Sequence, residues 1–159
     1  MIPTADRLRE LVSYDPETGV FTALVKRRGL NVGESIGTAH HSGYLICSID
    51  GHRNLLMHRL AWLYMMGEMP VAQIDHRNGN KSDNRWENLR LATFGQNQMN
   101  KGGWNKHLKG VNAGKRGFTA RIMACGRSYY LGHFKTAEAA HAAYQKAATR
   151  LHGDFARLA

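Results

Sequence analysis

The stretch from Ile74 to Asn100 constrains the fold of this chain most strongly. It holds two short strand-like runs separated by a polar loop rich in Asn, Gly, Asp and Ser, and then a helical segment that a threonine opens. This order predicts a β-hairpin closed by a helix. Such an arrangement would bring four polar side chains to one face, namely Asp75, His76, Asn88 and Asn97.

These four residue types fit the chemistry of phosphodiester hydrolysis with one metal ion. A histidine has an ordinary pKa of about 6.5 and can take a proton from water near neutral pH, so His76 is the expected general base. Asp75 and Asn97 offer the oxygen ligands that Mg²⁺ prefers. Asn88 can tie the loop back to the histidine strand through hydrogen bonds from its side chain to the backbone.

Positive charge gathers in the C-terminal third of the sequence. The whole chain has 22 Lys and Arg against 12 Asp and Glu, a net charge of +10. Residues 1–57 hold six basic and six acidic side chains, whereas residues 102–159 hold ten and two. A segregated basic surface attracts nucleic acid more often than any other partner, and a charge kept only for solubility would not need the segregation.

Composition and cysteine usage limit the class of protein. No apolar run reaches the roughly 20 residues of a membrane helix, and the N-terminus lacks the apolar core of a secretory signal. Cys47 and Cys125 lie far apart, which suits a reducing compartment and leaves no four-ligand thiolate zinc site. We therefore expect an intracellular protein without structural zinc and without a membrane partner.

The N-terminal part is predicted to hold a helix and a small antiparallel sheet. Thr4 can cap a helix over residues 4–13, with Leu8, Leu11 and Val12 as its apolar stripe. Short alternating runs and Gly-containing turns then indicate strands up to residue 57. An apolar segment at residues 58–66 predicts a buried helix that a glycine ends.

The C-terminal part is predicted to be three strands and one helix. Strands are expected at 110–112, 117–124 and 128–134, with turns at 114–117 and 125–127. Alternation in the middle strand makes one face apolar and places Arg121 on the other. Thr136 caps the helix. The inner stripe of that helix is predicted to be Ala140, Ala143, Tyr144, Ala147 and Leu151.

The order D-H-x-N-G-N-x-x-D-N-x-x-x-N-L-R, followed by Asn97, resembles the HNH nucleases in their phage and intron homing-endonuclease branch. The upstream run HRLAWLYMMGEMP extends the resemblance to about residues 14–101. The resemblance implies a ββα-metal fold with His76 as general base and Asn88 holding the loop. It also implies that Asp75 and Asn97 bind one Mg²⁺ or Mn²⁺ ion.

Residues 108–158 resemble the APETALA or ethylene-response-factor DNA-binding domain, through YLGHFKTAEAAHAAYQKAATRLHGDFARL and the preceding KGV. The resemblance implies that the free sheet face enters the DNA major groove. The aligned contact positions are Lys109, Asn112, Arg121, Met123, Ser128 and Tyr130. Several differ from the plant residues, so no base preference carries over. The turn residues Arg116 and Arg127 are expected to bind phosphate, and Lys115 beside Arg116 is expected to contact DNA.

The sequence thus predicts an α+β protein: an N-terminal antiparallel β region, a ββα-metal unit, and a three-stranded antiparallel sheet packed on one helix. The expected domains are residues 1–57, the nuclease at 58–101, a linker at 102–108 and the DNA-binding domain at 109–159. We expect a site-specific homing endonuclease that nicks one strand of double-stranded DNA.

The expected setting is the cytoplasm of a bacterial host, with a phage or intron gene. The protein is expected to act as a monomer without an obligate protein partner. Two alternatives stay open: a non-catalytic, sequence-specific DNA-binding regulator, and a structure-selective or RNA-directed nuclease.

Overall fold

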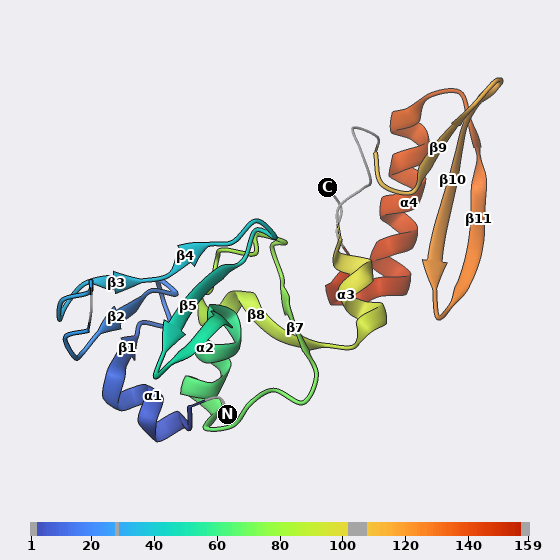
Figure 1. Ribbon diagram of the computed structural model, residues 1–159. Helices are drawn as coiled ribbons and strands as arrows, with labels where there is room; N and C mark the ends of the chain where they lie inside the picture. The colour runs from blue at the N-terminus through green and yellow to red at the C-terminus, as the bar shows by residue number, and fades with distance from the viewer. Residues whose placement is uncertain (1–2, 28, 102–107, 157–159) are drawn as a thin grey trace. The chain divides into compact units, whose positions relative to one another are not determined.

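The computed structural model describes residues 3–27, 29–101 and 108–156 (Figure 1). The chain has an α+β fold with small antiparallel sheets and, within those ranges, four α-helices. It divides into two compact units, Met1–Ala92 and Thr93–Ala159. Among the described residues, no helix has the length and apolar character that a membrane span requires.

The two units do not follow the predicted domain boundaries. The boundary expected after residue 57 lies inside the first unit, because residues on both sides of it share one core. The second unit begins at Thr93 and so includes the helix of the predicted nuclease domain. The predicted linker falls mostly on residues 102–107, which lie outside the described residues. The limits of the functional domains stay predictions.

The described residues of the first unit form two α-helices, a short 3-10 helix and three small sheets. Its helices are α1 (Ala5–Leu11), α2 (Met57–Met66) and η1 (Trp86–Asn88). Its strands are β1 (Val12–Tyr14), β2 (Phe21–Ala23), β3 (Ser35–Ile36), β4 (Thr38–Ala39), β5 (Leu45–Ile49), β6 (His52–Leu56), β7 (Gln73–His76) and β8 (Leu89–Ala92). They form the sheets β1-β2-β3, β4-β5-β6 and β7-β8.

The single N-terminal sheet predicted from the sequence is instead two sheets. Gly37 separates β3 from β4 at a φ of 129°, in the region that favours glycine, and a Cβ there would collide with the side chain of Met57. The chain therefore turns from one sheet into the next over the start of α2. Both sheets and both α-helices contribute to a common core that includes Leu8, Phe21 and Ile49.

The first helix is shorter than predicted. The predicted cap is confirmed, since Oγ1 of Thr4 accepts a hydrogen bond from the backbone N–H of Arg7. Leu8 and Leu11 lie in the core as expected, but Val12 is not part of the helix. It starts β1 and pairs with Ala23, where a β-branched side chain is favoured and is still fully buried.

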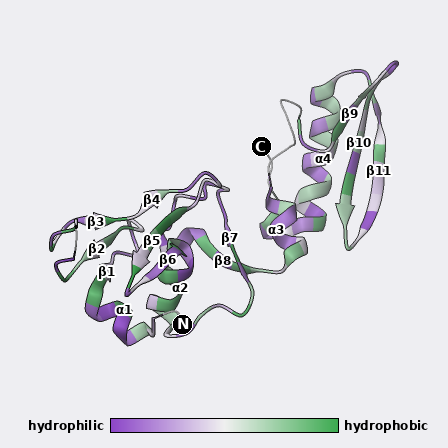
Figure 2. Ribbon diagram, in the orientation of Figure 1, coloured by the Kyte–Doolittle hydropathy of each residue, from purple (hydrophilic) through white to green (hydrophobic). Residues whose placement is uncertain are grey.

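The described residues of the second unit include a three-stranded sheet with the helix α4 packed on it. Its elements are α3 (Phe94–Asn100), β9 (Val111–Gly114), β10 (Gly117–Ala124), β11 (Arg127–Phe134), α4 (Ala137–His152) and η2 (Gly153–Phe155). The sheet order is β11-β10-β9, all antiparallel, and α4 crosses one face (Figure 1). Figure 2 shows hydrophobic colouring on part of β10, which contributes Ile122 to this core, and on β5 in the first unit.

The buried side of α4 differs from the prediction at its end. Ala140, Tyr144 and Ala147 are buried as expected, and Thr136 caps the helix by accepting from the N–H of Ala139. Leu151 was predicted inside but is exposed. His152 takes the inner position because its Nε2 lies 2.8 Å from the carbonyl oxygen of Met123 on β10. A polar contact across the sheet thus overrides the apolar stripe.

Candidate active site on the hairpin

The β7–β8 hairpin carries two of the predicted hydrolytic residues, Asp75 and His76, in the interior of the fold. Asp75 pairs with Arg90 and His76 with Leu89 in an antiparallel register. Asp75 and His76 are each only 4% exposed, which is unusual for charged or polar side chains. Their burial means that their neighbours, rather than bulk water, set their chemistry.

Asp75 forms a buried ion pair with Arg90. The Nη2 and Nε atoms of the guanidinium lie 2.6 and 2.8 Å from the same carboxylate oxygen, Oδ2. A charge buried without a partner is very costly, so the pairing offsets part of the cost of burying both side chains at this depth. Sequence analysis placed Asp75 in the site but did not foresee this pairing.

His76 lies in a group of aromatic and polar side chains. Its ring centroid is 5.1 Å from that of His58 and 5.9 Å from that of Tyr44. Its Nε2 is 3.3 Å from Oδ1 of Asn84. Burial is the main influence on this imidazole and lowers the pKa of His76, partly opposed by the contact with Asn84 and by Asp75. The ring is therefore neutral, and able to accept a proton, at neutral pH.

His58 is an even more deeply held imidazole. It is the second residue of α2 and is 6% exposed, and burial lowers its pKa to about 3, with a smaller contribution from neighbouring His76. Tyr44 packs against it at 4.9 Å between ring centroids. The ammonium of Lys81 lies 4.8 Å from the Tyr44 ring centroid and donates to the carbonyl of Ser42. This group joins the hairpin loop to the β4–β5 region.

Asn88 makes the hydrogen bonds to the loop that the sequence led us to expect. Its Oδ1 accepts from the backbone N–H of Asn78 at 3.0 Å, and its Nδ2 donates to the carbonyl of Asp83 at 2.7 Å. The carbonyl of Asn88 also accepts from the N–H of Arg77. These bonds close the loop between β7 and β8. A direct part for Asn88 in catalysis stays a prediction.

Asn84 is a site residue to which sequence analysis gave no role. Its side chain reaches His76, it is 2% exposed, and its backbone carbonyl accepts a 2.7 Å hydrogen bond from the hydroxyl of Tyr14. Asn84 is part of the sequence motif, but the loop contains several other asparagines. Residue type alone therefore did not distinguish it from its neighbours.

Asn97 lies on α3, in the second unit. Thr93 caps that helix directly after β8, in a capping box with Gln96, so the chain order of two strands and a helix agrees with the expected motif. Asn97 has the amide oxygen that the prediction requires. Its approach to Asp75 stays a prediction.

The donor types fit a weakly held divalent cation. Among the described residues, no group of three or more His, Cys, Asp or Glu gathers in a way that could hold a metal ion. The predicted ligands are instead one carboxylate, Asp75, and one amide. Mg²⁺ commonly binds through one or two carboxylates and completes its shell with water and substrate phosphate, so such a set is compatible with it.

Comparison with known proteins agrees with this hairpin. Residues 55–99 match the HNH endonuclease family. The matched segment contains α2, the β7–β8 hairpin and most of α3. An uncharacterized HNH endonuclease of Acanthamoeba polyphaga mimivirus is 33% identical over 118 residues, which is 72% of this chain but only 62% of the viral protein. No solved structure matches. Both matches support the enzyme class that was predicted from the sequence, an endonuclease.

Outside the HNH segment, five predicted DNA-binding residues share the sheet face opposite α4. Directly paired residues of antiparallel strands point to the same face. Arg121 pairs with Tyr130 and Met123 with Ser128, while Asn112 pairs with Thr119, which lies two positions before Arg121 on β10. Arg121 is exposed, and its guanidinium lies 5.9 Å from the Tyr130 ring centroid. This face combines cationic, aromatic and polar side chains.

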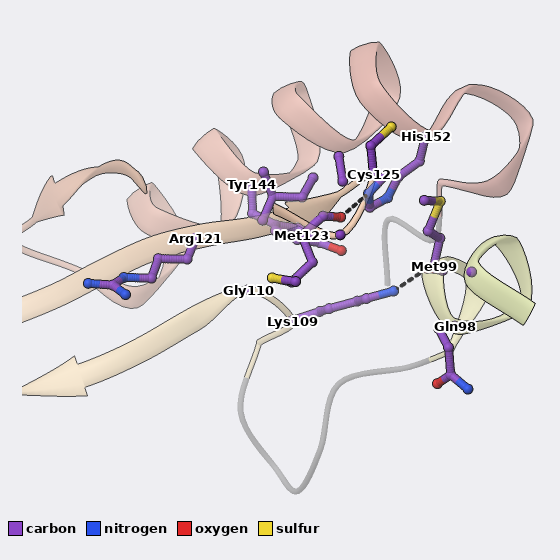
Figure 3. Close-up of a pocket in the computed structure, with 13 residues that line it drawn as sticks. Gln98, Met99, Lys109, Gly110, Arg121, Met123, Cys125, Tyr144 and His152 are labelled. Carbon is purple, nitrogen blue, oxygen red and sulfur yellow. Dashed lines mark hydrogen bonds between the residues drawn. The ribbon is translucent and has the colours of Figure 1, made fainter. Parts of the chain in front are cut away.

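The other predicted contact residues lie at the edges of this sheet. Lys115 and Arg116 form the β9–β10 turn, and Arg127 follows the β10–β11 turn. Lys109 lies apart from them. Its ammonium donates to the carbonyl of Met99 beside a cavity of about 360 Å³, whose lining also includes Tyr144 (Figure 3). A DNA contact by any of these residues stays a prediction.

Proposed function

We propose that this chain is a metal-dependent DNA endonuclease that hydrolyses a phosphodiester at the β7–β8 hairpin. One observation carries the proposal: within the segment that matches the HNH endonucleases, His76 is buried, its pKa is lowered by that burial, and it contacts a fixed amide. A neutral imidazole at neutral pH is the state a general base needs.

Each residue of the hairpin has a separate part in this proposal. His76 takes the proton from the attacking water, while Asn88 keeps the loop closed around it. Asp75 and Asn97 would hold one Mg²⁺ or Mn²⁺ ion. When bound, that cation supplies positive charge that offsets the charge developing on the phosphate and the leaving oxygen.

We further propose that the second unit locates the target as an APETALA-type DNA-binding domain. Its support is the shared sheet face that carries Arg121 and Tyr130, together with two basic turn residues at its edge. The strands of that face would read bases in the major groove, and the turns would bind phosphate. The target would be a specific duplex site.

A single catalytic centre on a monomer would nick one strand. The homing lifestyle, the phage or intron gene and the bacterial cytoplasm belong to the same proposal. The relative from Acanthamoeba polyphaga mimivirus supports the viral part of this proposal.

Cleavage of supercoiled DNA tests the nuclease. The full chain, His76→Ala and the control His52→Ala are incubated with plasmid carrying phage and host DNA, with Mg²⁺, with Mn²⁺ and with EDTA. We expect open circles from the wild type and the control, only with metal, and none from His76→Ala. General-base catalysis is worth about 10²–10⁴-fold in rate, so the loss should be of that size.

DNA affinity in EDTA should be nearly equal for the wild type and His76→Ala, since the imidazole is buried and is proposed to act on water. Linear product would show that both strands are cut. If the wild type binds DNA and cuts none with either metal, the chain is a DNA-binding regulator and the nuclease proposal is wrong.

A further inference from the structure

We propose that Asn84 is a positioning residue that fixes which nitrogen of His76 carries the hydrogen. The inference rests on the proposed function, in which His76 is the base. A neutral imidazole has one N–H donor and one acceptor nitrogen, and only the acceptor can take a proton from water. Whatever selects between the two neutral forms therefore decides whether the base faces its water.

The contact between the two side chains selects one form. Oδ1 of Asn84 lies 3.3 Å from Nε2 of His76. An amide oxygen can only accept, so this contact requires the hydrogen on Nε2. The lone pair then lies on Nδ1, and Nδ1 becomes the nitrogen that receives the proton of the attacking water.

Asn84 is itself held in place from a distant part of the chain. Tyr14 on β1 donates its hydroxyl to the Asn84 carbonyl. Gly19, at a φ of 73°, lies so close to the backbone of Asn84 and Arg85 that any Cβ there would collide with it. A fixed backbone leaves the short side chain of Asn84 little freedom. Its amide can therefore act as a rigid acceptor.

The amide nitrogen of Asn84 indicates that an asparagine is present here for a functional reason rather than for packing. Nδ2 of Asn84 is buried and has no hydrogen-bond partner among the described residues. A leucine has nearly the same shape and would bury no unpaired donor, so packing alone does not explain an asparagine here. The acceptor oxygen on the same side chain does explain it.

The rings around His76 complete the positioning. His58 meets the His76 ring edge to face, with 78° between the ring planes, and Tyr44 packs on the same ring. These contacts limit rotation of the imidazole but do not choose between its neutral forms. The Asn84 oxygen, by contrast, favours the form that carries the hydrogen on Nε2.

The variant Asn84→Leu tests the inference through kinetics. It keeps the volume and removes the acceptor, so we expect kcat to fall about 100-fold while KM stays unchanged, because ground-state DNA binding is untouched. Tyr14→Phe is the matched control: it removes a hydrogen bond to the same residue but leaves the amide facing His76, and its kcat should stay within about twofold of the wild type. A folded Asn84→Leu enzyme with wild-type kcat would overturn the inference.

The second readout is the imidazole ¹⁵N spectrum of the full chain labelled at histidine, at neutral pH without metal. Signals of His76 are assigned by their loss in His76→Ala. We expect the hydrogen on Nε2 in the wild type; a hydrogen on Nδ1 would overturn the inference, and this test needs no folded Asn84 variant. A wild type that cuts no DNA would contradict the proposed function, while the ¹⁵N spectrum would still decide which nitrogen carries the hydrogen.

Discussion

At the scale of single residues, the site is made of titratable groups taken out of water. His58, His76 and Asp75 are each less than 7% exposed, and each has a specific neighbour in place of solvent. For the two histidines, burial favours the neutral form. The buried histidines therefore make the stability of the folded chain depend on pH.

His58 should make the first unit sensitive to mild acid. Its folded pKa of about 3 lies far below the ordinary 6.5 of an unfolded histidine, so below pH 6.5 the unfolded chain binds a proton that the folded chain does not. Stability is therefore full above pH 6.5 and falls as the pH decreases. One such proton accounts for up to about 1.4 kcal/mol per pH unit.

Replacing this imidazole should reduce the acid sensitivity. In His58→Gln the free energy of unfolding should fall less steeply between pH 6 and pH 5, by about 1 kcal/mol per pH unit relative to the wild type. Urea unfolding at pH 7, 6 and 5 measures both slopes. Equal slopes in the two proteins would contradict a neutral, buried His58.

At the scale of elements, the β7–β8 hairpin depends on its loop. A two-stranded hairpin is marginal by itself, so side-chain bonds to the loop matter more than in a large sheet. Asn88 supplies two of these bonds from the position just before β8, and Asn84 adds the contact to His76. The loop that looks like a simple polar turn in the sequence is therefore a fixed part of the site.

Loss of the Asn88 side chain should weaken both folding and cleavage. Asn88→Ala removes hydrogen bonds to Asn78 and Asp83, and we expect a loss of about 1–2 kcal/mol of unfolding free energy with a reduced kcat. Asn80→Ala, in the same loop, is the control: it removes only solvent-exposed hydrogen bonds from Ser82 and should cost less than half as much. Chemical denaturation and plasmid nicking provide the two measurements. A loss for Asn88→Ala no larger than that for Asn80→Ala would contradict a special role of the buried Asn88 side chain in the loop.

At the scale of the whole molecule, charge divides the two units. The first has eleven basic and ten acidic residues, and the second has eleven and two. The second unit should therefore dominate the salt dependence of DNA binding, because each phosphate contact releases counterions. The predicted phosphate contacts in the β9–β10 turn are the simplest to examine.

Substitution of both turn cations should flatten that salt dependence. For Lys115→Ala/Arg116→Ala we expect the slope of log K against log salt to become smaller in magnitude by about 1.8, since each phosphate contact contributes about 0.9. Fluorescence anisotropy with a labelled duplex, between roughly 50 and 200 mM KCl, measures this slope. Lys146→Ala/Arg150→Ala changes two exposed cations on α4 and should leave the slope nearly unchanged. Equal slopes for both doubles would contradict phosphate binding by this turn.

Much of the architecture was determined by local sequence. The threonine caps at Thr4 and Thr136 and the alternation along β10 predicted their elements correctly, because capping and side-chain period act over a few residues. The same local order predicted the hairpin and placed Asp75 and His76 at the end of its first strand. The side-chain bonds of Asn88 to the loop were also predictable, since they span few residues.

The tertiary structure decided which of these side chains meet. Arg90 reaches Asp75 only through the strand register, and Asn84 meets His76 where Tyr14 on β1 and Gly19 in the β1–β2 turn lie against the loop. His152 replaces Leu151 on the inner side of α4 because a carbonyl of β10 lies within hydrogen-bonding distance. The sequence by itself determined the residue types and the elements that carry them. Their partners depend on packing between segments far apart in the chain, which no local pattern encodes.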